Sequence, residues 1–202
     1  MRLLLARHGE TPWNAERRFQ GSTDIALSER GRRQALGLRR GLRRYRLAAA
    51  YVSPLGRARE TATIALDGAG LPVVVMDDLR ELCLGEWEGH TVEEIRRRDG
   101  DPYLAWLRSP LDCPPPGGEP LPDVARRVVA ALERIAAAHP DGDDVLVLAH
   151  GGVISVYVCL LLGVSLNTLW RVRVDNASIT VVRPPRLVTV NDTTHLGDGR
   201  GP

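Results

Sequence analysis

The chain has 202 residues, which suits one α/β domain or a domain with a modest insertion, and this length can bury a core without disulfide bonds. Its 44% hydrophobic and 26% charged residues are ordinary for a soluble globular protein, and a net charge of +2 gives no general attraction to nucleic acid or membranes. All 27 basic residues are arginine, which excludes lysine Schiff-base chemistry and a P-loop lysine. Arginine forks suit phosphate, although we attribute most surface arginines to codon bias in a GC-rich genome.

Cysteine usage and the apolar runs bear on where the protein works. Cys83, Cys113 and Cys159 are odd in number and widely spaced, which indicates a reducing compartment without a disulfide framework or zinc site. The first apolar run is too short for a signal peptide, and the longest, residues 153–164, is too short to span a bilayer. We therefore expect a cytoplasmic protein.

Short apolar runs alternate with amphipathic stretches along the chain. They predict strands at residues 2–6, 48–52, 73–76, 145–149, 179–182 and 187–190. They predict helices after Ser28, a suitable N-cap, and at residues 56–66, 91–98, 103–107, 124–138 and 153–162. The alternation favours a three-layer α/β/α sandwich with a mostly parallel central sheet, whose last two strands lie antiparallel at an edge. Residues 1–202 are interpreted as one domain, with an insertion at about residues 84–123 that covers a site.

Two of the predicted strands end in the same way. Residues 3–6 lead into Arg7-His8-Gly9, and residues 145–149 lead into His150-Gly151-Gly152. Glycine after a strand permits a sharp turn and a close approach by a ligand. Open α/β folds bind ligands at the carboxyl ends of their parallel strands, so we expect both imidazoles in one crevice. The pair predicts a two-histidine phosphate site.

A third strand end supports this interpretation. Ser53 and Pro54 follow the second predicted strand, and Arg57 opens the next helix, where backbone N–H groups and the helix dipole favour an anion. A single histidine at a strand end is as well explained as a polar cap. Three strand ends that each offer a cation or an imidazole are hard to explain by packing.

These motifs resemble those of the histidine phosphatase superfamily, also called phosphoglycerate mutase-like. The resemblance rests on the R-H-G start, the S-P-x-x-R-A-x-x-T-A segment at residues 53–62 and the late A-H-G-G at residues 149–152. It covers nearly the whole chain, including residues 79–81 and 85–89. It implies the phosphoglycerate mutase-like fold, and the modest length resembles the short bacterial phosphatase branch.

The resemblance also implies roles for individual residues. His8 becomes the nucleophile and Glu81 the proton donor, with Glu10, Glu86 and Glu88 as rival acids. Phosphate binding falls to Arg7, Asn14, Gln20, Gly21, Arg57, His150 and Gly151. The chemistry suits these types, because a neutral imidazole is nucleophilic near neutral pH and guanidinium forks hold phosphate oxygens in pairs.

The function implied is a metal-independent phosphatase that hydrolyses small-molecule phosphate monoesters through a phosphohistidine on His8, with no cofactor. The alternatives are a cofactor-dependent phosphoglycerate mutase and a non-catalytic phosphate-binding protein on the same fold. We expect a small phosphorylated metabolite as partner, and neither nucleic acid nor a membrane. The natural substrate (phosphoserine, α-ribazole phosphate, a phosphosugar or a broad range), the oligomeric state, with a homodimer included, and the role of His195 and the tail stay open.

Overall fold

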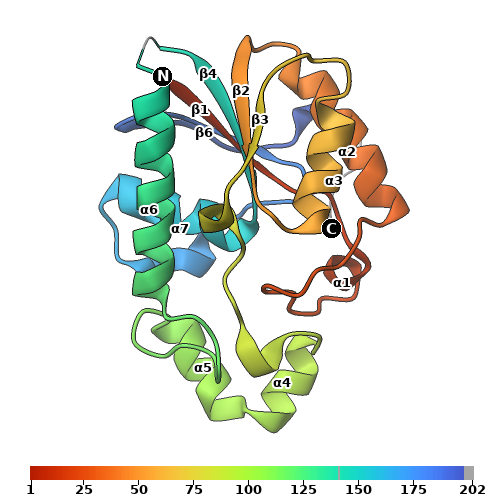
Figure 1. Cartoon of the computed structure of the whole chain (residues 1–202). Coiled ribbons are helices and arrows are strands. Elements are labelled where there is room, and N and C mark those ends of the chain that lie inside the picture. Colours follow the sequence, from red (N-terminus) through yellow and green to blue (C-terminus); the bar gives the residue numbers. More distant parts are fainter. Residues whose placement is uncertain (141, 198–202) are drawn as a thin grey trace.

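The computed structural model describes residues 1–140 and 142–197 as a sheet covered by helices on both faces (Figure 1). Its strands are β1 (Arg2–Arg7), β2 (Leu47–Val52), β3 (Val73–Val75), β4 (Asp144–Ala149), β5 (Ile179–Arg183) and β6 (Arg186–Asp192). Its α-helices are α1 (Pro12–Ala15), α2 (Glu29–Leu42), α3 (Gly56–Ala65), α4 (Val92–Arg98), α5 (Gly100–Arg108), α6 (Leu121–Ala138) and α7 (Gly151–Leu162). Short 3-10 turns are η1 (Asp77–Leu79), η2 (Gly85–Trp87), η3 (Leu166–Arg171) and η4 (Thr194–Leu196).

The strand order of the six-stranded sheet is β3-β2-β4-β1-β5-β6. β3, β2, β4 and β1 are parallel, whereas β5 and β6 run antiparallel at the edge beyond β1. This confirms the predicted fold class. The register of β1 on β4 pairs Arg7 with Ala149, so the next residues, His8 and His150, leave the sheet side by side.

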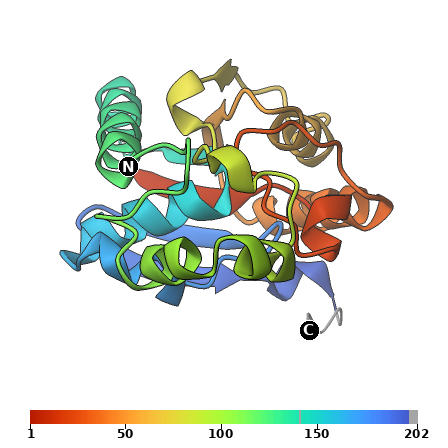
Figure 2. The same cartoon turned by 90° about the horizontal axis from the view of Figure 1, so that it is seen from below.

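The alternation of side chains along β1 explains the three layers. Leu3 and Leu5 belong to the core beneath α6 and α7, while Leu4 and Ala6 belong to the core beneath α2 and α3. Successive strand residues point to opposite faces, and a strand covered on both faces is apolar throughout. Figure 2 shows the same two helical layers from below. Ser28 caps α2 as predicted, because its Oγ accepts the Gly31 N–H at 3.0 Å.

Residues 84–123 fold into η2, α4 and α5, at the lower end of the molecule in Figure 1. Trp87 is fully buried at the centre of this region, donates its indole N–H to Asp99 at 2.9 Å and meets Trp106 edge-on at 5.2 Å. From this stretch only Leu84 lines the pocket described below. The division into one domain with a site-covering insertion stays a prediction, and residues 141 and 198–202 of that domain lie outside the described residues.

Within residues 1–140 and 142–197, no helix is both long enough and apolar enough to cross a membrane.

We expect Trp87→Ala to lower the free energy of unfolding by about 3–5 kcal/mol, because it leaves a cavity in the aromatic cluster that Trp87 forms with Phe19, Tyr103 and Trp106. Urea unfolding followed by circular dichroism measures this. Leu162→Ala is the control, since Leu162 is 54% exposed and should cost less than about 0.5 kcal/mol. Similar losses in the two variants would contradict the central position assigned to Trp87.

Candidate active site

The ends of β1 and β4 bring two histidines together. The rings of His8 and His150 lie 5.1 Å apart between centroids, and both side chains are buried. The His8 backbone N–H donates to Ala149 O at 3.1 Å, which continues the sheet pairing one residue further. The expected proximity of the two imidazoles therefore follows from the pairing of two adjacent parallel strands.

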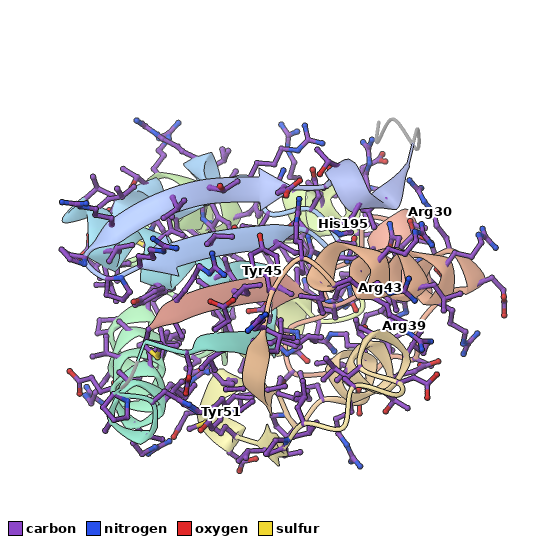
Figure 3. All side chains as sticks on the ribbon, turned by 90° about the horizontal axis from the view of Figure 1, so that it is seen from above. Arg30, Arg39, Arg43, Tyr45, Tyr51 and His195 are labelled. Atoms are coloured by element: carbon purple, nitrogen blue, oxygen red, sulfur yellow. The ribbon has the colours of Figure 1, made fainter. Side chains whose placement is uncertain are left out.

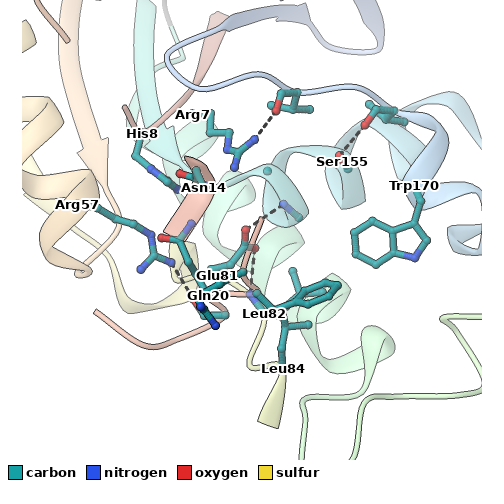
Figure 4. A pocket seen from close by; sticks show the side chains of 17 residues that line it. Arg7, His8, Asn14, Gln20, Arg57, Glu81, Leu82, Leu84, Ser155 and Trp170 are labelled. Carbon is teal, nitrogen blue, oxygen red and sulfur yellow. Dashed lines mark hydrogen bonds between the residues drawn. The ribbon is translucent and has the colours of Figure 1, made fainter. Parts of the chain in front are cut away.

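A cavity of about 270 Å³ opens at these strand ends (Figure 4). All the residues predicted for the site line it except His150, which lies buried behind His8. The lining residues among them are Arg7, His8, Asn14, Gln20, Gly21, Arg57, Glu81 and Gly151. Segments from four separate parts of the chain thus converge on one pocket.

His8 is held in the state that a nucleophile requires. Its Nδ1 lies 2.6 Å from Gly9 O, so Nδ1 carries the proton and Nε2 keeps its lone pair. Burial, reinforced by the charges of Arg7 and Arg57, holds the pKa of His8 well below its ordinary value. The imidazole is therefore neutral at neutral pH.

His150 is equally buried and is anchored on its far side. Its Nε2 lies 2.6 Å from Ser53 Oγ, the serine that opens the second motif. Burial lowers its pKa too, followed by the charge of Arg57. Its Nδ1 is buried without a hydrogen-bond partner among the described residues, which leaves one ring nitrogen for a ligand or a solvent molecule.

Backbone carbonyls position the two arginines of the pocket. Arg57 donates to Thr23 O and Gly21 O, both at 2.7 Å, and Arg7 donates to Val174 O at 2.7 Å. Burial lowers the pKa of each guanidinium. In the described part of the chain, neither Nε atom has a hydrogen-bond partner. The charges of these two guanidinium groups are therefore only partly offset, which favours the binding of an anion in the pocket.

The second motif also fastens the elements to one another. Thr61 Oγ1 accepts the Gly9 N–H at 3.0 Å and donates to Arg57 O at 2.7 Å, which joins the His8 turn to α3. The start of α3 does bind an anion, as its sequence suggested, but that anion is Asp24, which accepts the Gly56 N–H. This helix start is consequently occupied by the protein itself.

Among the acidic candidates only Glu81 lines the pocket. Its carboxylate accepts backbone N–H groups from Leu82 at 3.0 Å and from Gly152, in the first turn of α7, at 3.1 Å. Glu86 is exposed, and Glu10 pairs with Arg30 and Ser28.

Glu88 has a different task. Its carboxylate accepts the backbone N–H groups of Ser22, Thr23 and Leu84 at 2.9–3.0 Å, which ties the first loop to residues 84–88. The carboxylate hydrogen bonds depress the pKa of Glu88 despite its partial burial. Glu88 thus shapes the loop that carries Gln20 and Gly21.

Asn176 was not predicted as a site residue, yet it organises the pocket. Its side-chain N–H donates to His8 O at 3.2 Å and to Asn14 Oδ1 at 3.1 Å. Asn14 Oδ1 also accepts the Thr11 N–H at 3.1 Å, so its own NH₂ remains to face the pocket. Thr11 orients Gln20 similarly, because its hydroxyl donates to Gln20 Oε1 at 2.8 Å. No local motif reveals such contacts across 162 residues.

His195 lies outside the pocket. It sits beside α2 in Figure 3, its Nε2 lies 2.9 Å from Ala177 O, and its ring fills the space above Gly41. The Ala177 N–H in turn bonds to the carbonyls of Arg7 and His8, both at 3.1 Å. The tail therefore supports the His8 turn from behind.

The fold and pocket define a phosphate-handling α/β enzyme, and the comparisons identify its family. A model described as "Histidine phosphatase superfamily (branch 1)" matches residues 3–192, and this chain belongs to that superfamily. The chain is 36% identical to Phosphoserine phosphatase 1 of Hydrogenobacter thermophilus over 98% of this chain and 95% of that protein. Several named relatives are phosphatases, which confirms the predicted class of enzyme.

Similarity to solved structures supports the same family. The chain is similar to Bacillus stearothermophilus YhfR, with a TM-score of 0.90, 36% identity and coverage of 96% of this chain and 98% of that chain. It is also similar to mycobacterial glucosyl-3-phosphoglycerate phosphatase Rv2419c, with a TM-score of 0.87, 32% identity and coverage of 95% and 99%.

We expect Asn176→Asp to lower kcat/KM for p-nitrophenyl phosphate by roughly 10²-fold, the usual loss when one donor to a transition-state anion is removed. The new carboxylate would repel Asn14 Oδ1 or make the Asn14 amide rotate. After rotation, Asn14 would present its oxygen instead of its NH₂ to phosphate. Asn176→Ala keeps the Thr11 contact and should cost roughly tenfold less than Asn176→Asp.

Steady-state kinetics, inhibition by inorganic phosphate and melting temperatures test this order. Weaker phosphate inhibition in Asn176→Asp at an unchanged melting temperature would support the positioning role. A larger loss in Asn176→Ala than in Asn176→Asp would contradict it.

Proposed function

We propose that this chain hydrolyses phosphate monoesters of small molecules through a phosphohistidine intermediate on His8. One observation carries the proposal: a buried neutral imidazole, with Nδ1 bonded to Gly9 O, shares a pocket with the guanidinium groups of Arg7 and Arg57 and with the carboxyl group of Glu81. Relatives named as phosphoserine phosphatase and glucosyl-3-phosphoglycerate phosphatase support a small phosphorylated metabolite as substrate.

In the first step His8 Nε2 attacks phosphorus, a P–N bond forms and the P–O bond to the alcohol breaks. Arg7 and Arg57 bind the non-bridging oxygens, while the amides of Asn14 and Gln20 donate to them. Positioning and charge stabilisation dominate phosphoryl transfer, so a pocket of forks and amides suits it. Glu81 in its acid form protonates the departing alkoxide.

In the second step water attacks the phosphohistidine. The Glu81 carboxylate takes the proton of that water, the P–N bond breaks, and inorganic phosphate leaves with His8 neutral again. The backbone of Gly21 and Gly151 completes the phosphate pocket, and His150, beside His8, offers the Nδ1 atom that has no partner among the described residues. No metal enters this sequence, because the two guanidinium groups meet the phosphate charge. Metal independence and cytoplasmic location stay predictions.

Brief incubation with ³²P-labelled substrate should trap a phosphoenzyme that is acid-labile and base-stable, since P–N bonds of phosphohistidine break in acid. His8→Ala should abolish both label and turnover, a loss of at least ~10³-fold. Acid quench against base quench, followed by electrophoresis, measures the label.

All reactions contain EDTA. Glu86→Gln is the matched control, because Glu86 is exposed and lies outside the pocket lining. An acid-stable label, or activity that returns only with Mg²⁺ or Zn²⁺, would contradict the mechanism. Phosphate binding without any turnover would favour the non-catalytic alternative.

Glu81→Gln should slow single-turnover transfer from an alkyl phosphate by ~10²-fold or more relative to transfer from p-nitrophenyl phosphate. An alkoxide needs the proton, whereas p-nitrophenolate leaves without it. Rapid-quench measurement of the first step separates this effect from the later loss of a general base. Equal losses on the two substrates, or a leaving-group dependence in Glu86→Gln instead, would remove the acid role from Glu81.

A further inference from the structure

We infer that the pocket selects phosphate monoesters whose alcohol is apolar and uncharged, in preference to those that carry a carboxylate near the ester. This inference rests on the proposed function and adds the substrate class. It differs from the substrate that the name of one relative would suggest, because that relative is named phosphoserine phosphatase and phosphoserine carries a carboxylate.

The pocket has two chemically different halves. In Figure 4, Arg7, His8, Arg57 and Glu81 lie on one side, while Leu82, Leu84 and Trp170 lie on the other. The apolar residues that line the pocket are Phe19, Leu82, Leu84, Trp170, Val172 and Val174. Phosphate belongs in the half with the cations, so the alcohol of a bound monoester must meet the apolar half.

Aromatic packing holds the apolar half in place. The Trp170 ring lies 4.4 Å from that of Trp106, and Phe19 meets Trp106 edge-on at 5.6 Å. Trp170 nevertheless remains 40% exposed, so its indole offers apolar surface that a ligand can cover. Covering such a preformed wall improves binding by roughly fourfold for each buried methylene group.

A substrate carboxylate would find no free cation here. Among the described residues that line the pocket, the cations are Arg7, Arg57 and Arg18. The first two lie in the phosphate half. Arg18 donates to Glu16 at 2.6 Å, to Glu94 at 3.2 Å and to Gly89 O at 2.9 Å, so two carboxylates already offset its charge.

The remaining polar groups do not change this balance. Ser155 is directed to Val172 O at a long 3.5 Å and carries no charge, and Glu81 would repel a second carboxylate. An unpaired charge that loses water in an apolar chamber is strongly disfavoured. The same chamber accepts a phenyl or alkyl group without that loss.

The first test compares kcat/KM for 2-phenylethyl phosphate, n-propyl phosphate, O-phosphoserine and 3-phosphoglycerate. We expect 2-phenylethyl phosphate to exceed the two carboxylate esters by ~10-fold or more, a difference of about 1.4 kcal/mol. Serine is the better leaving group because its ammonium withdraws electrons, so intrinsic reactivity cannot produce this order.

A value for O-phosphoserine or 3-phosphoglycerate equal to or above that of 2-phenylethyl phosphate would overturn the inference and leave the phosphatase intact. If the enzyme hydrolysed none of these four esters and did not hydrolyse p-nitrophenyl phosphate, the proposed function itself would be overturned.

The second test compares the wild-type enzyme with variants on 2-phenylethyl phosphate and n-propyl phosphate. Trp170→Ala should raise KM for 2-phenylethyl phosphate by roughly tenfold and change n-propyl phosphate less than twofold. Val188→Ala, on the exposed face of β6 and outside the pocket, is the control and should change neither. Equal losses on both esters in Trp170→Ala would overturn the role of Trp170 in recognising the alcohol.

Arg18→Gln distinguishes the competing interpretation, in which this guanidinium reads a carboxylate. We expect less than a twofold change for O-phosphoserine relative to 2-phenylethyl phosphate. A selective loss with O-phosphoserine would show that Arg18 binds its carboxylate, and would overturn the inference.

Discussion

The burial of two guanidinium groups beside two neutral imidazoles is the constraint on which the rest of this site depends. Arg57 is fully buried, and burial lowers the pKa of both Arg57 and Arg7. Carbonyls of Gly21, Thr23 and Val174 accept their N–H groups, but carbonyl dipoles offset only part of a cation's lost hydration. In the proposed mechanism a phosphate dianion supplies the remainder, so its binding would relieve a cost already built into the fold.

Burial and, after it, the same two positive charges set the protonation state of His8. A buried histidine near two arginines cannot readily accept a proton, and in the proposed mechanism the neutral form is the one that attacks phosphorus. Gly9 O then decides which nitrogen keeps the lone pair. In the proposed mechanism the arginines bind the substrate and also help burial to keep His8 neutral, so a substitution of either arginine would affect both functions.

The features that the sequence predicted well are those that depend on local pattern. Apolar runs that end in His8 and His150 identified two strands, and parallel pairing then placed the two rings together. Glu81 followed from resemblance, since a glutamate after a 3-10 turn has no local signature of its own.

Contacts between distant segments could not be predicted. Asn176 reaches Asn14 and His8 only because β5 lies beside β1, and Glu88 became a loop organiser because three backbone N–H groups happen to converge on it. Trp170 belongs to none of the sequence motifs. It lines the pocket in the folded protein, where it packs against Trp106.

Family membership explains one half of the pocket, and the other half is particular to the individual chain. The motif residues build the half of the pocket to which we assign the phosphate, and they lie on strand ends and helix starts whose geometry the fold determines. The other half is built by Phe19, Leu82 and Trp170, which come from loops and turns outside those motifs. Loops tolerate change better than the sheet beneath them, so the wall that meets the alcohol can vary while the phosphate half stays the same. The relatives are named for different phosphate esters, which fits this division. The substrate of a given chain must therefore be inferred from the residues of its own apolar half.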